Sequence, residues 1–559
     1  MKDKIRFFAL ENAIKFKGKA NTGAVIGKIL SIKPEAKKDM KTLSKTINKI
    51  VSEVNSMSLE EQKKAFKNVD KIKKPKKKIV EGLPPLPKAV KGKVITRIPP
   101  EPSKYSHLGH ALSFLINYTY AKMYDGKCIV MFEDTNPEKS TQEFADAILE
   151  DLEYLKIKPD AVRFASDNME YMYEMAEKLI KKKKAYVCIC DRDMMKDLRD
   201  KALCCECSNR NNVEVNLAEW KKMLKGEYDE GQAILRLRGN MESKNHVMRD
   251  PVIFRINKKP HFKQKNKYCV WPLYDFENSV SDSLNKITHI LRSSEFGKMR
   301  IELQNYIKDC LGFRKQVVIQ YGRFNFSGAT TKGREIRELI SSGKVTGWDD
   351  PSLVTIRALK RRGILPETFK ELMMQMKLSR NTSKKVDWSM ISSINKHILD
   401  PKVNRYFFIE NPKEIKIKKA PKQEIKINLH PDHPKKGSRT FKTHNEFYVC
   451  KQDFMNFKKG KLVRLKDCLN FEAGKEHVFH SLDHEEYKSK GNMIIQWLPK
   501  SKNLVKVEIR MPDNNIKKGL GEAALKTLKS GDIIQFTRFG FCKLEEIKNN
   551  TYKFIFTNK

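Results

Sequence analysis

Two histidines that flank a leucine and a glycine occur in the segment RIPPEPSKYSHLGHA, residues 97–111. The prolines predict a turn, and the apolar residues that follow predict a helix. The N-terminus of a helix offers unpaired backbone N–H groups and the positive end of a dipole, which together favour an anion such as phosphate. His107 and His110 would lie beside this anion, and Gly109 would let it approach the backbone. Histidines at a helix start more often cap or pack, so the wider context decides their role.

A second group of residues suited to chemistry is a set of cysteines in CICDRDMMKDLRDKALCCEC. Cys188, Cys190, Cys205 and Cys207 form two Cys-x-Cys pairs, and Cys204 is left over as a substitute for Cys205. Four thiolates at this spacing suit tetrahedral zinc, which would be structural because protein fills every position. Free buried thiols are the alternative.

The composition points to a nucleic-acid partner. Among 559 residues, Lys and Arg number 112 against 68 Asp and Glu, which gives a formal net charge of +44. Such a balance favours a polyanion, although any single lysine is more often just solvated. The sequence lacks both a membrane-spanning apolar run and a signal-peptide core, so we expect a cytoplasmic protein whose eleven cysteines are not a disulfide framework.

The elements that position these residues alternate between strand and helix. KVITRI, ALSFLINYTYAKMY and KCIVMFED read as strand, helix and strand, a βαβ pattern that predicts a parallel sheet with ligands at the carboxyl ends of its strands. Short β-rich runs near the C-terminus predict antiparallel barrels. The expected units are helices over 1–67, a Lys/Pro linker over 68–92, an α/β domain over 93–184 and 269–347 split by an insertion over 185–268, a helical connector over 348–409, and β-barrels over 410–559.

Four segments carry a family resemblance: PPEPSKYSHLGHA, VMFEDTNPEKS, YDFENSVSDSLNKITHILRSSEF and GKVTGWDDPSLVTIRALKRRGI occur in this order. The set resembles class I glutamyl-tRNA synthetases of the archaeal and eukaryotic type, sisters of the glutaminyl enzymes. ALENAIKFKGKANTGAVIGKIL is similar to the archaeal N-terminal extension, and NLHPDHPKKGSRTF to the start of the C-terminal barrels. The resemblance therefore covers nearly the whole chain.

The resemblance implies a Rossmann-like catalytic domain that activates glutamate with ATP and Mg²⁺ and then transfers it to tRNA(Glu). His107 and His110 would act electrostatically, as donors to phosphate oxygens, with Gly109 and Lys332 completing the catalytic set. Lys332 lies in FNFSGATTKGREIREL, where relatives usually have a Ser-Lys-Arg core. Thr331 replaces the serine, Gly333 replaces a basic or small polar residue, and Lys104 stands where glycine is usual. The expected ATP-binding residues are Pro102, Ser103, His107, Leu108, Gly109, His110, Ser293, Arg323, Phe324, Thr331 and Lys332.

Glutamate recognition requires an anion for the ammonium group and a cation for the side-chain carboxylate. By the resemblance, Glu133 supplies the anion and Arg292 the cation, whereas glutaminyl relatives have a small neutral residue at the position of Arg292. The expected glutamate-binding residues are Arg97, Glu101, Glu133, Tyr274 and Arg292.

The resemblance also places tRNA along the chain. The insertion would meet the acceptor end, the barrels would meet the anticodon, and the connector would face phosphates through Arg357, Lys360, Arg361 and Arg362. Archaeal relatives have paired cysteines in the same insertion, which favours zinc, and the family suggests a monomer. The N-terminal extension resembles modules that contact partner proteins, and no such partner is identified by the sequence.

Four alternatives stay open on this evidence. The enzyme could also charge tRNA(Gln), or it could be a glutaminyl-tRNA synthetase. The altered second signature motivates a non-catalytic tRNA-binding scaffold. A general basic DNA-binding protein is the last alternative, and it leaves the ordered motifs unexplained.

Overall fold

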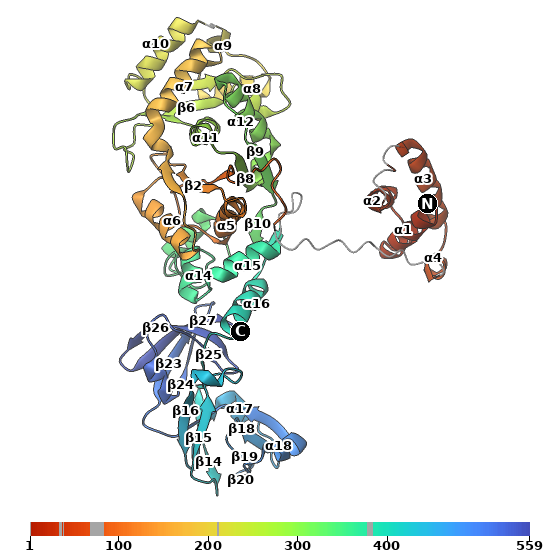
Figure 1. The fold of residues 1–559 in the computed structure, drawn as a ribbon, viewed down its shortest axis with the longest axis vertical. Coiled ribbons are helices and arrows are strands. Elements are labelled where there is room, and N and C mark those ends of the chain that lie inside the picture. The colour runs from red at the N-terminus through yellow and green to blue at the C-terminus, as the bar shows by residue number, and fades with distance from the viewer. Residues whose placement is uncertain (1, 33–35, 37–38, 68–82, 210–211, 377–383) are drawn as a thin grey trace. The chain divides into compact units, whose positions relative to one another are not determined.

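The computed structural model describes residues 2–32, 36, 39–67, 83–209, 212–376 and 384–559. It contains two compact units, Met1–Glu81 and Gly82–Lys559. Figure 1 colours the first unit red and runs from orange to blue through the second. Among the described residues, no helix combines the length and the apolar character that crossing a bilayer requires.

The first unit is helical, as the sequence predicts, and its described residues form α1 (Lys2–Lys15), α2 (Thr22–Ile32), α3 (Met40–Asn55) and α4 (Leu59–Lys67). Its own apolar core includes Ile5, Leu10 and Ile47. A capping box begins α4, because the Ser58 backbone N–H donates to the Glu61 carboxylate at 2.8 Å and the Glu61 N–H donates to the Ser58 hydroxyl at 3.3 Å.

Only the end of the predicted Lys/Pro linker lies within the described residues, since 68–82 fall outside them. Residues 83–92 form no helix or strand, as expected, but they pack onto the second unit. Leu83 and Leu86 are buried in its main core, and the Tyr120 hydroxyl donates to the Pro84 carbonyl oxygen at 2.7 Å. This stretch is therefore part of the α/β domain surface.

The α/β domain is built on parallel strands. Strand β1 (Ile95–Ile98) pairs with β2 (Lys127–Phe132), which pairs with β3 (Ala161–Phe164), and β8 (His289–Ser293) pairs with β9 (Val317–Tyr321). The second pair joins the first where the Thr288 N–H donates to the Ile95 carbonyl oxygen at 3.0 Å. The spatial order is thus β3-β2-β1-β8-β9, and the direction of winding reverses between β1 and β8. Ligands bind at such a reversal, outside the carboxyl ends of the strands.

The helix that follows β1 is α5 (Leu108–Met123), and the helix that follows β2 is α6 (Gln142–Tyr154). Ala111, Leu112 and Leu115 of α5 are buried in the core that also contains Val130 of β2 and Leu291 of β8. This burial fixes the start of α5 at the edge of the sheet where β1 and β8 end.

An insertion interrupts the parallel sheet, as predicted, and it forms a sheet of its own that is antiparallel. Its order is β4 (Ala185–Cys188), β5 (Ile234–Leu237), β6 (Val252–Ile256) and β7 (Val270–Pro272). Trp220, Phe254 and Trp271 form its core with apolar residues of the flanking helices. Those helices are α7 (Met169–Lys181), α10 (Val213–Leu224), α11 (Tyr274–Leu284) and α12 (Gly297–Leu311). Two further helices, α8 (Arg192–Asp200) and α9 (Glu206–Asn209), contribute to a smaller cluster around the cysteines. The sheet ends at Pro272, beyond the expected boundary at 268.

After β9 the chain forms β10 (Phe324–Phe326), which pairs in parallel with β11 (Lys384–Val386). The intervening and following helices are α13 (Gly333–Ser341), α14 (Ile356–Arg362), α15 (Pro366–Met376) and α16 (Trp388–Leu399). The last residues of the expected helical connector instead form two short strands, β12 (Arg405–Tyr406) and β13 (Phe408–Glu410), which join the C-terminal sheets.

Two seven-stranded sheets and one antiparallel pair, β15 with β16, make up the C-terminal part. The orders of the two larger sheets are β12-β25-β26-β27-β23-β24-β13 and β21-β18-β19-β20-β14-β17-β22. Most pairs are antiparallel, as predicted, but β12/β25, β14/β20, β18/β21 and β23/β27 are parallel. Alternate residues of one segment enter two cores, because Phe407 and Ile409 face one and Tyr406 and Phe408 face the other. The remaining bounds are β14 (Pro412–Lys418), β15 (Gln423–Asn428), β16 (Ser438–Thr443), β17 (Glu446–Cys450), α17 (Lys451–Met455), β18 (Leu462–Leu465), β19 (Asn470–Glu472), β20 (His477–Ser481), α18 (His484–Lys490), β21 (Gly491–Ile495), β22 (Trp497–Pro499), β23 (Val505–Arg510), β24 (Ile516–Gly521), β25 (Ile533–Phe536), β26 (Gly540–Lys548) and β27 (Thr551–Asn558).

Candidate active site

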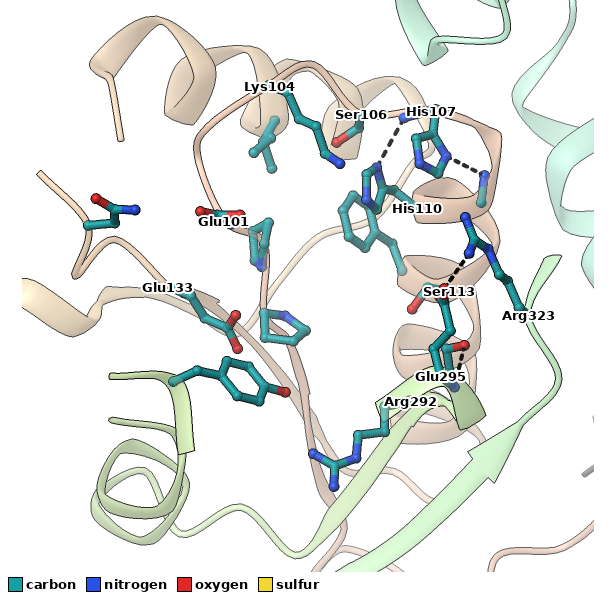
Figure 2. Close-up of a pocket in the computed structure, with 18 of the residues that line it drawn as sticks. Glu101, Lys104, Ser106, His107, His110, Ser113, Glu133, Arg292, Glu295 and Arg323 are labelled. Carbon is teal, nitrogen blue, oxygen red and sulfur yellow. Dashed lines mark hydrogen bonds and ion pairs between the residues drawn. The ribbon is translucent and has the colours of Figure 1, made fainter. Parts of the chain in front are cut away.

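A cavity of about 620 Å³ opens at the carboxyl ends of the parallel strands. Pro99 follows β1, Glu133 follows β2, Arg292 ends β8, and Arg323 follows β9, and all four line it. Figure 2 shows His107 and His110 on one side of this pocket, and Glu133 and Arg292 on another. The pocket therefore lies where the strand order predicts a ligand.

The histidine turn caps α5. His107 is the N-cap residue, and its Nδ1 accepts a hydrogen bond from the Gly109 backbone N–H at 3.0 Å. His110 Nδ1 accepts the His107 backbone N–H at 3.2 Å, and the two rings stack with centroids 3.9 Å apart. The sequence left capping and catalysis as alternatives, and this geometry allows both because each ring uses only one nitrogen for the cap.

Both imidazoles are neutral. Burial lowers the pKa of His107 to about 3, with further lowering by Lys104 and Arg323, and burial lowers the pKa of His110 well below its usual value. An Nδ1 that accepts a hydrogen bond carries no proton, so the proton of each neutral ring is on Nε2. Each ring thus has one N–H group left to donate to an anion, without carrying a charge or acting as a base.

The opposite end of the pocket combines carboxylates with an arginine. Glu133, Glu277, Tyr274 and Arg292 all line it. Glu133 accepts a hydrogen bond from the Asn278 side-chain amide at 2.8 Å, and burial raises the pKa of both glutamates. The Arg292 guanidinium donates to the Gln304 side-chain oxygen at 3.0 Å. The positive charge of an ammonium group bound beside the two glutamates would lower their pKa values again and so favour the ionised carboxylates.

Arg97 lies beneath this end instead of in it. Its side chain is only 2% exposed, and its guanidinium donates to Asp282 and, at 2.6 Å, to the Asn278 side-chain oxygen. Two of its three guanidinium nitrogens are thus directed at protein side chains, and contact of Arg97 with a ligand carboxylate stays a prediction. Asn278, which accepts from Arg97, also donates to Glu133, so the two charged residues are linked through this amide.

The expected ATP residues divide into two groups. Ser293, Arg323, Phe324 and Thr331 line the pocket together with the histidine turn, and Glu101 lines its mouth. Pro102, Ser103 and Leu108 do not line it: Pro102 is buried, the Ser103 N–H donates to the Glu101 carbonyl oxygen, and Leu108 packs into the core. Direct contact of these three residues with ATP stays a prediction, and in this structure they belong to the turn and the core.

Lys332 also lies outside the pocket lining. Its side chain is 72% exposed, and its ammonium pairs at 2.8 Å with Glu335 in the first turn of α13, the helix that Lys332 precedes. Arg323, by contrast, lines the pocket and pairs with Glu295. For Lys332 to reach a phosphate, its ion pair with Glu335 must open.

The four expected metal ligands converge. One sulfur from each of Cys188, Cys190, Cys205 and Cys207 lies within 4.8 Å of all the others, with 3.9 Å between the sulfurs of Cys188 and Cys205. Sulfurs at about 2.3 Å from a tetrahedral zinc are about 3.8 Å apart, so the thiols fit this ion. Arg236 donates to Cys205 Sγ at 3.6 Å and to Cys188 Sγ at 3.9 Å, and Cys204 is exposed outside the cluster.

Most basic residues expected to face tRNA phosphates are held by the protein. Arg362 is 4% exposed and donates to the Thr557 carbonyl oxygen at 3.0 Å, so the protein holds it here and its contact with tRNA stays a prediction. Arg357 pairs with Glu150 at 2.7 Å, and Arg361 pairs with Glu545 at 2.6 Å. Lys360 is exposed and stays a prediction. Helix α14 thus joins the α/β domain to the C-terminal sheets.

Several residues that line the pocket are not among the predicted site residues, including Ser106, Arg255 and Glu277. Lys104 departs from the family pattern, but the sequence does not predict its place in the lining. A helical period could have found Glu277, which lies three residues after Tyr274 and so on the same face of α11. No local signal marks Arg255, because it reaches the pocket from β6 of the inserted sheet.

A parallel sheet wound in two directions, a histidine-capped helix at its reversal and an inserted antiparallel sheet define a class I aminoacyl-tRNA synthetase. Residues 93–401 match the family described as tRNA synthetases class I (E and Q), catalytic domain. Residues 403–494 and 494–545 match two anti-codon binding domains of the same synthetases.

Curated relatives extend this match over the whole chain. A glutamate–tRNA ligase of Pyrococcus furiosus is 42% identical and covers 99% of this chain and 98% of its own length. The enzymes of that name from Pyrococcus abyssi and Methanocaldococcus jannaschii are 41% and 38% identical, each over 99% of this chain and over 98% and 99% of their own lengths. The chain belongs to the family of class I tRNA synthetases for glutamate and glutamine.

Proposed function

We propose that this chain is an ATP-dependent glutamate–tRNA ligase that attaches L-glutamate to tRNA(Glu) for protein synthesis. Full-length relatives of that name, at about 40% identity, support the proposal. The observation that carries it is that Arg292 and Glu133 lie in one pocket with His107 and His110. Arg292 can bind the side-chain carboxylate of an amino acid and Glu133 its ammonium group. The two histidines can donate to a nucleotide phosphate.

In the first step, an oxygen of the α-carboxylate of glutamate attacks the α-phosphorus of ATP, which binds as its magnesium complex. The bond from that phosphorus to the bridging oxygen breaks, and pyrophosphate leaves with the electron pair. Negative charge gathers on the phosphate oxygens during the step, so fixed donors stabilise the transition state more than the ground state. The Nε2–H groups of His107 and His110 are such donors, and they transfer no proton.

In the second step, the 2′-hydroxyl of the terminal adenosine of tRNA attacks the carbonyl carbon of glutamyl-adenylate, and AMP leaves. The inserted sheet would bind the acceptor end that carries this hydroxyl. Residues 403–545, which match the anticodon-binding domains, would bind the other end of the tRNA. Lys360, which is exposed on α14 between these parts, is assigned to the tRNA backbone.

Charging assays test the proposal directly. Purified protein would be given ATP, radiolabelled glutamate or glutamine, and purified tRNA(Glu) or tRNA(Gln). We expect glutamate on tRNA(Glu), and we expect Arg292→Gln to lower kcat/KM for glutamate. If the protein binds tRNA but forms no acylated product, the ligase proposal fails and the protein is a tRNA-binding scaffold. Preferential charging of glutamine would contradict the role of Arg292, and glutamate on tRNA(Gln) would identify a non-discriminating enzyme.

Lys332 is assigned to the ATP phosphates, on the argument that its exposed loop can move toward the pocket once the Glu335 pair opens. The test compares Lys332→Ala with Lys344→Ala, a substitution at an exposed lysine after the same helix. We expect ATP–pyrophosphate exchange to fall only in the first variant. Equal rates for both variants would remove Lys332 from the catalytic set.

We propose a structural zinc ion on Cys188, Cys190, Cys205 and Cys207. The distances between the sulfurs support it, because free thiols have no need to gather at tetrahedral spacing. Mass spectrometry under native conditions should find one zinc ion per chain. Cys207→Ser should lose the ion and lower the melting temperature, whereas Cys204→Ser should keep it, since that thiol is exposed outside the cluster. Wild-type protein purified without any bound metal would contradict the site.

A further inference from the structure

Lys104 lies in the turn between β1 and α5, and its side chain lines the same pocket as the two histidines. The residue is half-buried. In Figure 2 its side chain runs from the backbone of the turn toward His110. The turn therefore presents an ammonium group next to the N–H donors that are assigned to the ATP phosphates.

Gly333, the first residue of α13, packs against this lysine. A Cβ atom at Gly333 would lie 3.3 Å from Lys104 Cδ and 3.9 Å from Lys104 Cβ, which is closer than an ordinary carbon contact in the first case. The φ angle of Gly333 is outside the left-handed region, so the backbone does not require glycine there. The missing side chain instead leaves space for the aliphatic part of Lys104.

The charges around the pocket leave this ammonium available. In the described ranges, no carboxylate lies within ion-pair distance of Lys104, whereas Arg323 pairs with Glu295 and Lys332 pairs with Glu335. A half-buried cation without a counter-ion is costly, and an anion bound in the pocket would supply the missing charge.

The neighbouring rings agree with an anion at this place. After burial, which has the largest effect, the charge of Lys104 is a further cause that lowers the pKa of His107 and of His110. Lys104 thus helps to keep both rings neutral, so that they donate from Nε2 without adding positive charge. One ammonium and two N–H groups then surround the same space.

The geometry points to Lys104 as a ligand of the ATP triphosphate, with Gly333 leaving the room that its side chain occupies. This assignment rests on the proposed ATP-dependent ligase activity. An ammonium is a compact charge with three donors, and it can contact two phosphate groups at once without the planar geometry that arginine requires. Lys104 then contributes from the fixed turn, whereas Lys332 contributes from the loop.

The experiment measures glutamate-dependent ATP–pyrophosphate exchange in the presence of tRNA. Lys104→Met removes the charge and keeps most of the side chain, and Lys127→Met is the control because Lys127 is exposed at the opposite end of β2. We expect Lys104→Met to raise KM for ATP about tenfold, with KM for glutamate unchanged, since a hydrogen bond to a charged group is lost. Lys127→Met should match wild type.

A double-mutant cycle tests the part of Gly333. Gly333→Ala should raise KM for ATP less than Lys104→Met, because it displaces the lysine without removing it. Gly333→Ala should have no further effect in a Lys104→Ala background, where the clashing atoms are gone. Additive effects would contradict the packing argument.

Two other results would overturn the assignment. If Lys104→Met keeps the wild-type KM for ATP, the ammonium does not bind the triphosphate. If it raises KM for ATP and glutamate equally and lowers the melting temperature, its role is structural. Failure of the proposed function looks different, because wild-type protein would then catalyse no exchange at all.

Discussion

His107 has two separable duties, and substitutions can remove them one at a time. Its Nδ1 caps α5 by accepting the Gly109 N–H at 3.0 Å, and its Nε2–H is left for a phosphate oxygen. His107→Ala removes both groups. His107→Asn keeps a side-chain oxygen that can cap a helix, but the shorter side chain cannot place an N–H where Nε2 lies.

The expected magnitudes differ for the two duties. Loss of one N-cap bond costs about 1 kcal/mol of unfolding free energy, so Ala should be destabilised by about that amount and Asn by much less. Loss of a donor that strengthens in the transition state lowers kcat by roughly 100-fold or more, and this should occur in both variants. Thermal unfolding measures the first effect and ATP–pyrophosphate exchange measures the second.

The control is His397→Asn, because His397 is exposed on α16 away from the pocket. It should retain both stability and exchange. Wild-type exchange in His107→Asn would refute the reasoning, since the ring would then serve only as a cap. Equal loss of stability in the Ala and Asn variants would instead contradict the capping argument.

Three further predictions follow from the same structure. Burial lowers the pKa of His107 to about 3, so below about pH 6.5 the unfolded chain binds a proton at this residue that the folded chain does not bind. The melting temperature should therefore fall as the pH is lowered from 7 to 4. The fall should be less steep in His107→Asn, which lacks the titrating ring. The buried carboxylate of Glu522 accepts hydrogen bonds from Arg439 at 3.0 Å and from the Phe407 N–H at 2.7 Å. Glu522→Ala should therefore lower the free energy of unfolding by about 3–5 kcal/mol, measured with denaturant. Glu508→Ala, which opens a surface ion pair with Lys518, should lower it by at most about 1 kcal/mol. A Cβ at Gly126 would lie 2.1 Å from the Val94 carbonyl oxygen, so Gly126→Ala should lower the melting temperature, whereas Gly27→Ala, with no atom within 4 Å, should not.

The parallel sheet and the histidine turn could be predicted because their signals are local. Alternation in KVITRI and KCIVMFED, with a helical period between them, specifies β1, α5 and β2 without reference to distant residues. The cysteine cluster is similar, since two Cys-x-Cys pairs bring four sulfurs together and the residues between the pairs form little more than the short helix α8.

The surroundings of some predicted site residues depend on partners that lie far away in the sequence, and the sequence could not predict them. Arg97 is held by Asp282, which is 185 residues away, and Arg362 is held by the Thr557 carbonyl oxygen, which is 195 residues away. A basic residue beside a predicted site can bind either a ligand or the protein, and its own segment does not distinguish them. The parallel pairs in the C-terminal sheets, such as β14 with β20, are equally long-range and leave no mark on the alternation within each strand.

The turn that carries His107 and His110 depends on residues that lie far outside its own segment of the sequence. The Leu108 N–H donates to the Val354 carbonyl oxygen and the Ile356 N–H donates to the Ser106 carbonyl oxygen, both at 2.9 Å, so one wall of the pocket is held by residues that begin α14. Residues 93–347 would thus be an incomplete enzyme even though they contain every residue that lines the pocket. A fragment ending there would lose two backbone hydrogen bonds at the turn, and the smallest chain able to hold both rings in place must continue into the connector.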